Sequence, residues 1–581
     1  MNLSAAALFI FAFTIYLLTL YPNVPGGDSG ELITAAYRMT VAHPPGYPLY
    51  TLLAKLFTFI PHGSIAWRVN LLSAFCDSLA AAVLLLSVTR WSKNLFSGWI
   101  AGGLFAFSPL IWEYAVGAEV FALNNLICAL LFYCAIRFSE SLESKFAYFF
   151  ALFLGLGLCH HYTFIFFALF FGIPIFRRVS FSKRKALLLI FLGYSPVLYL
   201  FLAGTQRSTF SWGHTADIPN LISHLLRSEY GSFRLGAISK GTDTHFIEGM
   251  YAYAISLFKN SLYLGPFAAL YGIIQQFKNT KKDSLLAWSI IAYTGYLIFF
   301  HAFSNLDPAD PLTLGVISRF WQMPSLIFFA WVGLGTSSFF KEIKGQKIQK
   351  LTPLFMTGTL IAAQIYVHYT PCNQSKNSIV SDYGKAILTP LPLNALVMTE
   401  GDLNEHVLKY LQYCENLRTD VYVISQQLIN APWYNDAIAA EFPDIILPGR
   451  RHSEGIENGF VQEGLSDEQK KAKPYSLRNF LELNAPLHLL YNVGGIQPGD
   501  ITSIDAHFAT YPLGISHFLV PKADEPNLDL PLLLKQGQEA LLLFSPMTTH
   551  PPSPTSWEYW AMSEYQKAVK QTQLFKVFVT K

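Results

Sequence analysis

The first two thirds of the chain alternate long apolar runs with short polar joints. A complete transmembrane helix takes about 20 apolar residues, and a short or half-crossing helix takes fewer. This pattern predicts a polytopic α-helical membrane protein with about eleven transmembrane segments. The runs are residues 3–21, 69–89, 98–113, 119–137, 146–159, 161–176, 186–203, 251–274, 285–301, 316–339 and 351–369.

After about Thr370 the pattern changes, because charged residues occur throughout and no run is long enough to span. Short apolar runs alternate here with one amphipathic stretch, which predicts a soluble α/β domain over 371–581 behind a membrane domain over 1–370. The expected helix is 403–417. The expected strands are 394–400, 420–425, 485–494 and 539–546. No Gly-rich phosphate-binding motif is present, so nucleotide binding is not supported.

Basic residues give the expected orientation. They concentrate in five joints, and with eleven segments all five lie on one side of the membrane, which the positive-inside rule makes the cytoplasm. The joints are 90–93, 137–145, 177–185, 278–283 and 341–350. The N-terminus is then cytoplasmic, and residues 22–68 and everything after 370 face the other side. The first run lacks a basic leader and a small-residue cleavage site, so we expect a retained helix.

Composition agrees with a membrane protein. The 581 residues are 52% hydrophobic and only 14% charged, against about 25% charged in a typical soluble domain. The net charge of +3 is too small to suggest a nucleic-acid partner. The lipid bilayer is therefore the expected environment, in either a bacterial inner membrane or the endoplasmic reticulum.

The joint after the first run, "YPNVPGGDSGELITAAYRMTVAHPPGYPLY" (21–50), carries two acids at helical spacing. In one interpretation Asp28 caps a helix and Glu31 completes a capping box. In the other, Asp28 and Glu31 share one helix face at the outer membrane surface. A carboxylate there takes a proton from an incoming hydroxyl, and dry surroundings raise its pKa towards the working pH. The two interpretations are compatible.

Several motifs carry a resemblance to a known family. They are "VPGGDSGELITAAYRMTVAHPPGYPLYTLLAKL", "GSIAWRVNLLSA", "AEVFALNNL", "WGH", "LLRSEYGSF" and "GVISRFW". From Val24 to about Trp321 the chain resembles the transmembrane protein 260 family, which includes a protein O-mannosyltransferase and bacterial relatives. The resemblance implies a GT-C type glycosyltransferase, an enzyme that uses sugar carried on a polyprenyl or dolichyl phosphate. It also implies a catalytic acid in the first external loop, which by position is Asp28.

Six other residues are candidates for the site. Arg319 offers bidentate donors to a lipid phosphate, or it is an interfacial arginine that snorkels. His43 binds phosphate or packs in a Pro-rich turn, and Arg68 and Arg227 are weaker candidates for the same role. Glu119 is a second acid or a helix N-terminal residue favoured by the dipole.

His160 lies at an outer turn beside a second histidine. Two adjacent histidines make a poor metal pair, so we expect neither a metal nor another cofactor. The family tends to have Asn-Gln-His where this chain has His-His-Tyr, so the resemblance does not carry a histidine role over to His160, which stays a candidate for the acceptor side of the site.

The sequence therefore predicts a membrane glycosyltransferase that moves a sugar from a lipid phosphate to an acceptor hydroxyl, with inversion. Mannose comes only from the resemblance, and the acceptor is a protein Ser/Thr or a glycan. The alternatives are a lipid-linked-sugar transporter or flippase and a non-enzymatic membrane scaffold. Transporters place polar residues near the midplane, often in repeats, whereas here the acids and arginines are expected at the outer ends of the segments.

Overall fold

The computed structural model describes residues 3–177, 181–228, 245–279, 284–343, 346–447 and 476–580. Parts of three basic joints, at 178–180, 280–283 and 344–345, lie outside the described residues, as does the end of the motif "LLRSEYGSF".

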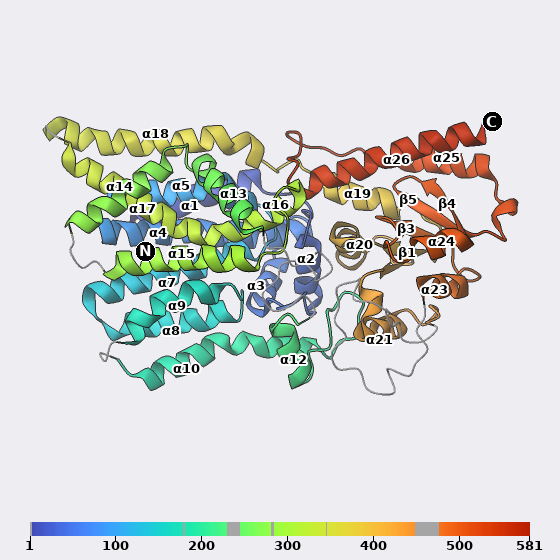
Figure 1. Ribbon diagram of the computed structural model, residues 1–581, viewed down its shortest axis with the longest axis horizontal. Helices are drawn as coiled ribbons and strands as arrows, with labels where there is room; N and C mark the ends of the chain where they lie inside the picture. The colour runs from blue at the N-terminus through green and yellow to red at the C-terminus, as the bar shows by residue number, and fades with distance from the viewer. Residues whose placement is uncertain are drawn as a thin grey trace.

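The chain up to Cys372 is helical. Its long helices lie side by side in one half of the molecule (Figure 1). The helices are α1 Leu3–Thr19, α2 Ser29–Arg38, α3 Pro48–Thr58, α4 Ile65–Ser92, α5 Leu95–Phe107, α6 Pro109–Ala115, α7 Phe121–Ser141, α8 Ser144–Leu158, α9 Phe164–Phe176, α10 Lys183–Tyr194, η1 Ser195–Val197, α11 Leu198–Ala203, α12 Ile218–Leu225, α13 Phe246–Asn260, α14 Gly265–Asn279, α15 Ser284–Phe303, α16 Pro311–Ser318, η3 Arg319–Trp321, α17 Gln322–Glu342 and α18 Gln346–Cys372.

Several of these helices are long and apolar enough to cross a membrane. In the described part of the chain five qualify by length and composition: α4, α7, α15, Lys183–Ala203 and Pro311–Glu342. The pair α5 and α6, bent by 61°, makes up to six. α10 also exposes Leu188, Phe191 and Leu192, as expected for a helix that faces lipid. The protein is thus an integral membrane protein, and the count of eleven segments stays a prediction.

The segment expected as one run over 251–274 is instead two helices, α13 and α14. Leu262 and Tyr263 between them have φ of 53° and 61°. Two consecutive residues in the left-handed conformation cannot continue a right-handed helix. The left-handed conformation costs roughly 1–2 kcal/mol per residue. The expectation of a single helix there is therefore wrong, because hydropathy does not report the backbone break.

The chain after Cys372 forms the other half of the molecule (Figure 1). Its elements are α19 Ile379–Leu388, β1 Leu396–Thr399, α20 Asp402–Glu415, β2 Tyr422–Ser425, η4 Leu428–Asn430, α21 Pro432–Glu441, α23 Leu477–Asn484, β3 Leu490–Val493, α24 Ile501–His507, β4 Phe508–Leu513, β5 Ser516–Pro521, η6 Glu525–Asn527, α25 Leu530–Leu541 and α26 Trp557–Val579. The strands form one sheet in the order β2-β1-β3-β5-β4.

Strands β2, β1 and β3 are parallel, with Leu396 opposite both Tyr422 and Leu490, and β5 and β4 add an antiparallel hairpin. The first three expected strands and the expected helix coincide with β1, β2, β3 and α20. The strand expected over 539–546 is wrong, because 530–541 is helix α25, capped by Asp529. The hairpin was not expected; its turn holds Gly514 at φ 65°.

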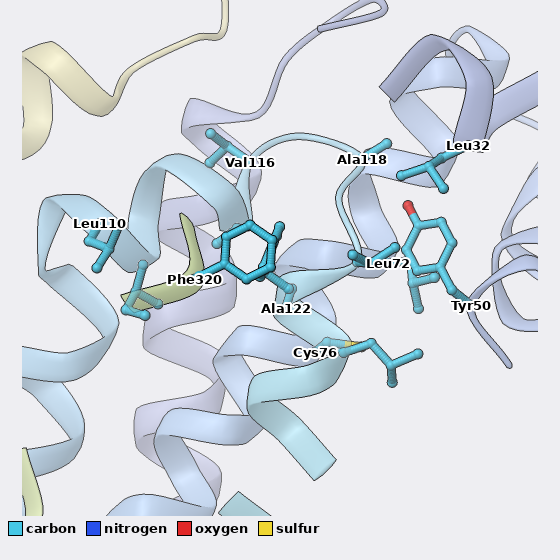
Figure 2. Packing of buried hydrophobic residues seen from close by; sticks show 14 of the residues in the cluster. Leu32, Tyr50, Leu72, Cys76, Leu110, Val116, Ala118, Ala122 and Phe320 are labelled. Carbon is cyan, nitrogen blue, oxygen red and sulfur yellow. The ribbon is translucent and has the colours of Figure 1, made fainter. Parts of the chain in front are cut away.

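The hydrophobic core runs without interruption from the helices into the second half. One cluster of buried residues includes Tyr16 and Trp112 of the helical half as well as Val397 and Tyr410. A smaller cluster, with Met398 and Ile424, covers the other face of the sheet. Figure 2 shows the close packing in the helical half, where Leu32, Ala118 and Phe320 lie among other buried residues. Each of these three is the direct neighbour in sequence of a charged residue. Their packing in the core therefore restrains the backbone at those charged residues.

Candidate functional site

The first acid of the joint, Asp28, precedes α2 but does not cap it. Its backbone is helical, with φ −74° and ψ −10°, and its side chain makes no hydrogen bond to the helix start. Instead, its Oδ2 accepts a hydrogen bond of 2.9 Å from Nη1 of Arg319. The capping-box expectation is therefore wrong for Asp28, because a stronger, charge-assisted partner takes its carboxylate.

Arg319 joins two acids that are far apart in the sequence. Its Nη1 lies 2.9 Å from Asp28 Oδ2 and 3.5 Å from Glu119 Oε1. Asp28 comes from the loop before α2, Glu119 from the turn before α7, and Arg319 from η3, where α16 gives way to α17. All three side chains are at most 18% exposed. The sequence indicated the three residues of this ionic triad separately, but it did not show that they lie together.

The triad keeps unused hydrogen-bonding capacity. Glu119 Oε2 and Arg319 Nε are buried and have no hydrogen-bond partner. The guanidinium carbon of Arg319 lies 5.6 Å from the ring centre of Phe121 and 5.8 Å from that of Phe320, so two aromatic faces hold it in place. A buried polar atom without a partner is costly, and such atoms are common where a ligand binds.

The second acid, Glu31, binds His43 through both of its carboxylate oxygens. Its Oε1 accepts from the backbone N–H of His43 and its Oε2 from Nδ1–H of the same residue, both at 2.6 Å. The reach back to the helix start that a capping box requires is therefore absent. The other ring nitrogen, Nε2, lies 3.3 Å from the hydroxyl of Tyr47, and the ring of Trp212 is 6.3 Å away. Glu31 thus fixes the orientation and the protonated nitrogen of His43.

The charges set the protonation states of these groups. Burial alone would raise the pKa of Asp28, but the Arg319 guanidinium, with His43 and His406, holds it well below its usual range. The expectation of a raised pKa is therefore wrong, since the nearby cations outweigh the dry surroundings. Burial would lower the pKa of His43, but the Glu31 carboxylate raises it above the ordinary value. Asp28 is thus ionised and His43 favours its protonated form.

His160 and Arg227 lie at the border of this cluster. The ring of His160 is 6.2 Å from that of Tyr47, and its Nε2–H donates to the Val120 carbonyl at 2.9 Å. Burial lowers the pKa of His160 to about 4, so this histidine is neutral and supports the turn that carries Glu119. The guanidinium of Arg227 lies 5.1 Å from the ring centre of Tyr162.

Arg68 is not brought into the cluster. Its guanidinium donates to the backbone carbonyls of Thr58, His62 and Gly63, at 3.0 to 3.2 Å. These carbonyls lie at and beyond the end of α3, where helices leave acceptors unpaired. We therefore correct the expectation of a phosphate-binding role: Arg68 closes the end of α3.

Sequence reasoning missed the residues that the second half contributes. His406 of α20 places Nδ1 3.0 Å from the carbonyl oxygen of Gly27, and the ring of Trp557 lies against Gly26 and Gly27. No local signal marked His406, because about half of the residues of α20 are polar and such a helix is expected at the surface. Only its packing on α2 buries His406 to 8% exposure.

In the described part of the chain, no group of three or more His, Cys, Asp or Glu side chains is placed to hold a metal ion. The chemistry that the cluster offers is acid–base and electrostatic: an ionised carboxylate, a buried guanidinium and an imidazole held by a second carboxylate.

Comparison with known proteins finds relatives along almost the whole chain. Residues 28–185 match the model of the Protein O-mannosyl-transferase TMEM260 N-terminal domain, and residues 380–483 match TMEM260-associated domain 2. The chain is 32% identical to Protein O-mannosyl-transferase TMEM260 of Mus musculus, covering 98% of this chain and 81% of the relative. It is 30% identical to Protein O-mannosyl-transferase tmem260 of Dictyostelium discoideum, covering 96% and 71%.

The fold is similar to that of a solved membrane enzyme. The structure of ArnT from Cupriavidus metallidurans bound to undecaprenyl phosphate aligns with a TM-score of 0.56 over 89% of this chain and 97% of that chain, at 9% identity. Its apo structure aligns with a TM-score of 0.54. At such low identity the likeness concerns the fold, and that fold is of the GT-C type.

Proposed function

Because the chain belongs to the TMEM260 family of protein O-mannosyl-transferases, we propose that it transfers mannose from a polyprenyl- or dolichyl-phosphate donor to a Ser/Thr hydroxyl at the Asp28 cluster. That the chain is a membrane glycosyltransferase follows from the family. The donor, the acceptor and the residues that act are the proposal. The observation that carries it is the triad in which Arg319 lies between Asp28 and Glu119.

Arg319 is proposed to receive the donor phosphate. Its Nε has no partner and its Nη1 is shared by two carboxylates, so a phosphate oxygen finds a donor already desolvated and oriented. His43 adds positive charge at the same cluster, since its pKa is raised by Glu31 against the effect of burial. Both cations then stabilise the negative charge that grows on the leaving phosphate. Arg227 is proposed to add positive charge to the phosphate site from a greater distance.

Asp28 is proposed to be the base. In the free protein burial raises the pKa of Asp28, but the nearby cations, Arg319 first, lower it by more. Asp28 is therefore a weak proton acceptor in the free protein. A bound phosphodiester brings a negative charge beside Arg319 and offsets this effect, so the pKa of Asp28 rises when the donor is in place. The base is thus strengthened by the substrate that it needs.

The transfer step balances as a single displacement. The acceptor O–H proton passes to an Asp28 carboxylate oxygen while the hydroxyl oxygen forms a bond to the anomeric carbon. The bond from that carbon to the phosphate oxygen breaks, and the lipid phosphate leaves with the bonding pair. The anomeric centre inverts. Glu119, whose Oε2 has no partner, is proposed as a second acid that positions the acceptor.

The orientation belongs to the same proposal. We place the N-terminus and the basic joints in the cytoplasm, residues 1–370 as the membrane catalytic part, and residues 371–581 on the non-cytoplasmic side with the site. The N-terminus lies within the helical half, whereas the C-terminus lies at the far end of the other half (Figure 1). The second half then lies on the side from which a secreted acceptor arrives.

The test is mannose transfer by purified protein from a polyprenyl-phosphate donor to a Ser/Thr peptide. Asp28→Asn removes the base and keeps the size, so we expect kcat to fall by roughly 10²–10⁴-fold, as is typical of a lost acid–base group. The matched control is Asp310→Asn. Asp310 caps α16 by accepting from Leu312 and Thr313, and Asn caps about as well, so that variant should transfer normally. Unchanged transfer by folded Asp28→Asn would remove Asp28 as the base.

A further inference from the structure

We propose that His406, on α20 of the second half, is a positioning residue for Asp28. It acts through the backbone: it holds the carbonyl of Gly27, the residue directly before Asp28. This inference rests on the proposed function of Asp28. It assigns a part of the active-site geometry to a helix that lies about 380 residues away in the sequence.

The hydrogen bond is well defined chemically. Nδ1 of His406 lies 3.0 Å from the Gly27 carbonyl oxygen. A carbonyl oxygen only accepts, so Nδ1 must carry the proton. The bond is buried. Little water competes there for its donor and acceptor, so it holds its geometry better than a surface contact does. It therefore restrains the peptide unit that links Gly27 to Asp28.

The Asp28 side chain supplies no local restraint on this loop, although the Asp28 carbonyl accepts from the Leu32 N–H at 2.9 Å. Asp28 makes no cap bond, and Gly27 has φ 67°, a conformation that glycine adopts but does not enforce. Two contacts from the second half close on it. An added Cβ at Gly27 would lie 2.6 Å from Nε1 of Trp557, and one at Gly30 would lie 2.6 Å from the carbonyl oxygen of His406. The glycines of "PGGDSG" thus permit the approach of the second half.

Charged neighbours favour a proton on His406. Burial lowers the pKa of this imidazole, but Glu31, Asp402, Glu405 and Asp28 together raise it above the usual value. Lys409 on the same helix is paired with Glu405. These carboxylates therefore favour the protonated imidazole, in which Nδ1 carries the hydrogen that it donates.

The decisive comparison is between two substitutions of His406. His406→Leu keeps a side chain of similar volume and removes the donor. His406→Asn places an amide nitrogen at the δ position, where Nδ1 was. We expect kcat at saturating donor and acceptor to fall about 10–100-fold in His406→Leu, as for a reacting group displaced by about 1 Å. The donor KM should stay within about threefold, and His406→Asn should recover kcat to within about threefold of wild type.

A matched control is available in His488. It is also 8% exposed and also sets Nδ1 3.0 Å from a backbone carbonyl, that of Asn394, but it lies two residues before β3, the middle strand of the sheet. His488→Leu should leave kcat of the folded protein unchanged. If His406→Leu yields no folded protein, His406→Gln takes its place, because its amide nitrogen sits at the ε position and misses Gly27.

A second readout separates this inference from the proposed function. Backbone hydrogen exchange of residues 24–31 should be faster in His406→Leu than in wild type or in His406→Asn, whether or not transfer is observed. Wild-type protein without transfer would overturn the proposed function. An active wild type whose His406→Leu variant keeps its kcat, or a His406→Asn variant as slow as His406→Leu, would overturn the positioning role.

Discussion

At the scale of single residues, the chemistry of the site depends on pairing. Asp28 and Glu31 are close in sequence and carry the same functional group, yet they have different partners: Arg319 for Asp28 and His43 for Glu31. Pairing with an arginine keeps Asp28 ionised. Pairing with a carboxylate raises the pKa of His43. Two acids three residues apart thus acquire separate roles from partners that lie elsewhere in the chain.

The pairing of Asp28 predicts a pH effect of Arg319→Gln. Burial raises the pKa of Asp28 and Arg319 is the main influence that lowers it, so removing the guanidinium should raise that pKa. More Asp28 is then protonated at pH 5–6. We expect the profile of kcat/KM against pH, which reports the free enzyme, to gain an acid limb that wild type lacks in this range. The same profile in variant and wild type would contradict the pairing.

The pairing of Glu31 predicts a different pH effect. Burial lowers the pKa of His43 and Glu31 opposes it, so Glu31→Gln should lower that pKa and reduce the protonated fraction of His43. We expect the donor KM to rise several-fold at pH 8 and less at pH 6. Glu140→Gln, in the surface pair with Lys93, is the control and should leave KM unchanged. Equal donor KM in Glu31→Gln and wild type at both pH values would exclude His43 from phosphate binding.

At the scale of elements, the packing of α2 against α20 determines where the loop that carries Asp28 lies. α2 carries Glu31 and α20 carries His406, and the two helices meet backbone to backbone at Gly30. The surface that α20 presents there is polar, so burial depends on close approach more than on apolar area. A small residue at Gly30 is the condition for that approach.

The close approach predicts the result of Gly30→Ala. The new Cβ would lie 2.6 Å from a backbone oxygen, so the helices must separate, at a cost of about 1–3 kcal/mol. We expect a lower thermal unfolding temperature in detergent and a reduced kcat. Gly358→Ala is the control, since nothing lies within 4 Å of its added Cβ; it should be neutral or slightly stabilising, as alanine favours helix by up to about 1 kcal/mol. Equal stability in both variants would show that the helices do not touch.

At the scale of the whole molecule, the two halves share one core. The cluster that contains Tyr16 and Trp112 also contains Val397 and Tyr410, and Tyr21 donates to Glu558 at 2.8 Å. The site lies where the halves meet, under α20 and the start of α26. A donor that arrives from the membrane and an acceptor that arrives from outside would meet at this junction.

The proposed orientation predicts the sidedness of cysteine labels. Lys341→Cys, at the end of α17, should react with a membrane-impermeant thiol reagent only from the cytoplasm, and Lys570→Cys, on α26, only from the other side. Both lysines are exposed, whereas all six native cysteines are buried, so background labelling should be low. Reaction of both labels from one side would exclude the proposed count of segments.

The sequence by itself determined the local and the periodic features of this protein. Long apolar runs located most of the long helices of the first half, and short apolar runs located β1, β2 and β3, because burial in lipid or in a sheet demands a continuous run of apolar side chains. The acids of the joint, His43 and Arg319 were also found, because charges beside apolar runs are conspicuous.

Only the tertiary structure decided what those residues do. The break at Leu262 and Tyr263 and the helix over 530–541 depend on backbone geometry and packing that hydropathy does not encode. Three further points depend on which partners come within a few ångströms. Asp28 does not cap α2, its pKa is lowered, and Arg68 lies outside the cluster. His406 was invisible for the same reason: its role comes from Gly27, and contacts across hundreds of residues leave no local pattern in the chain.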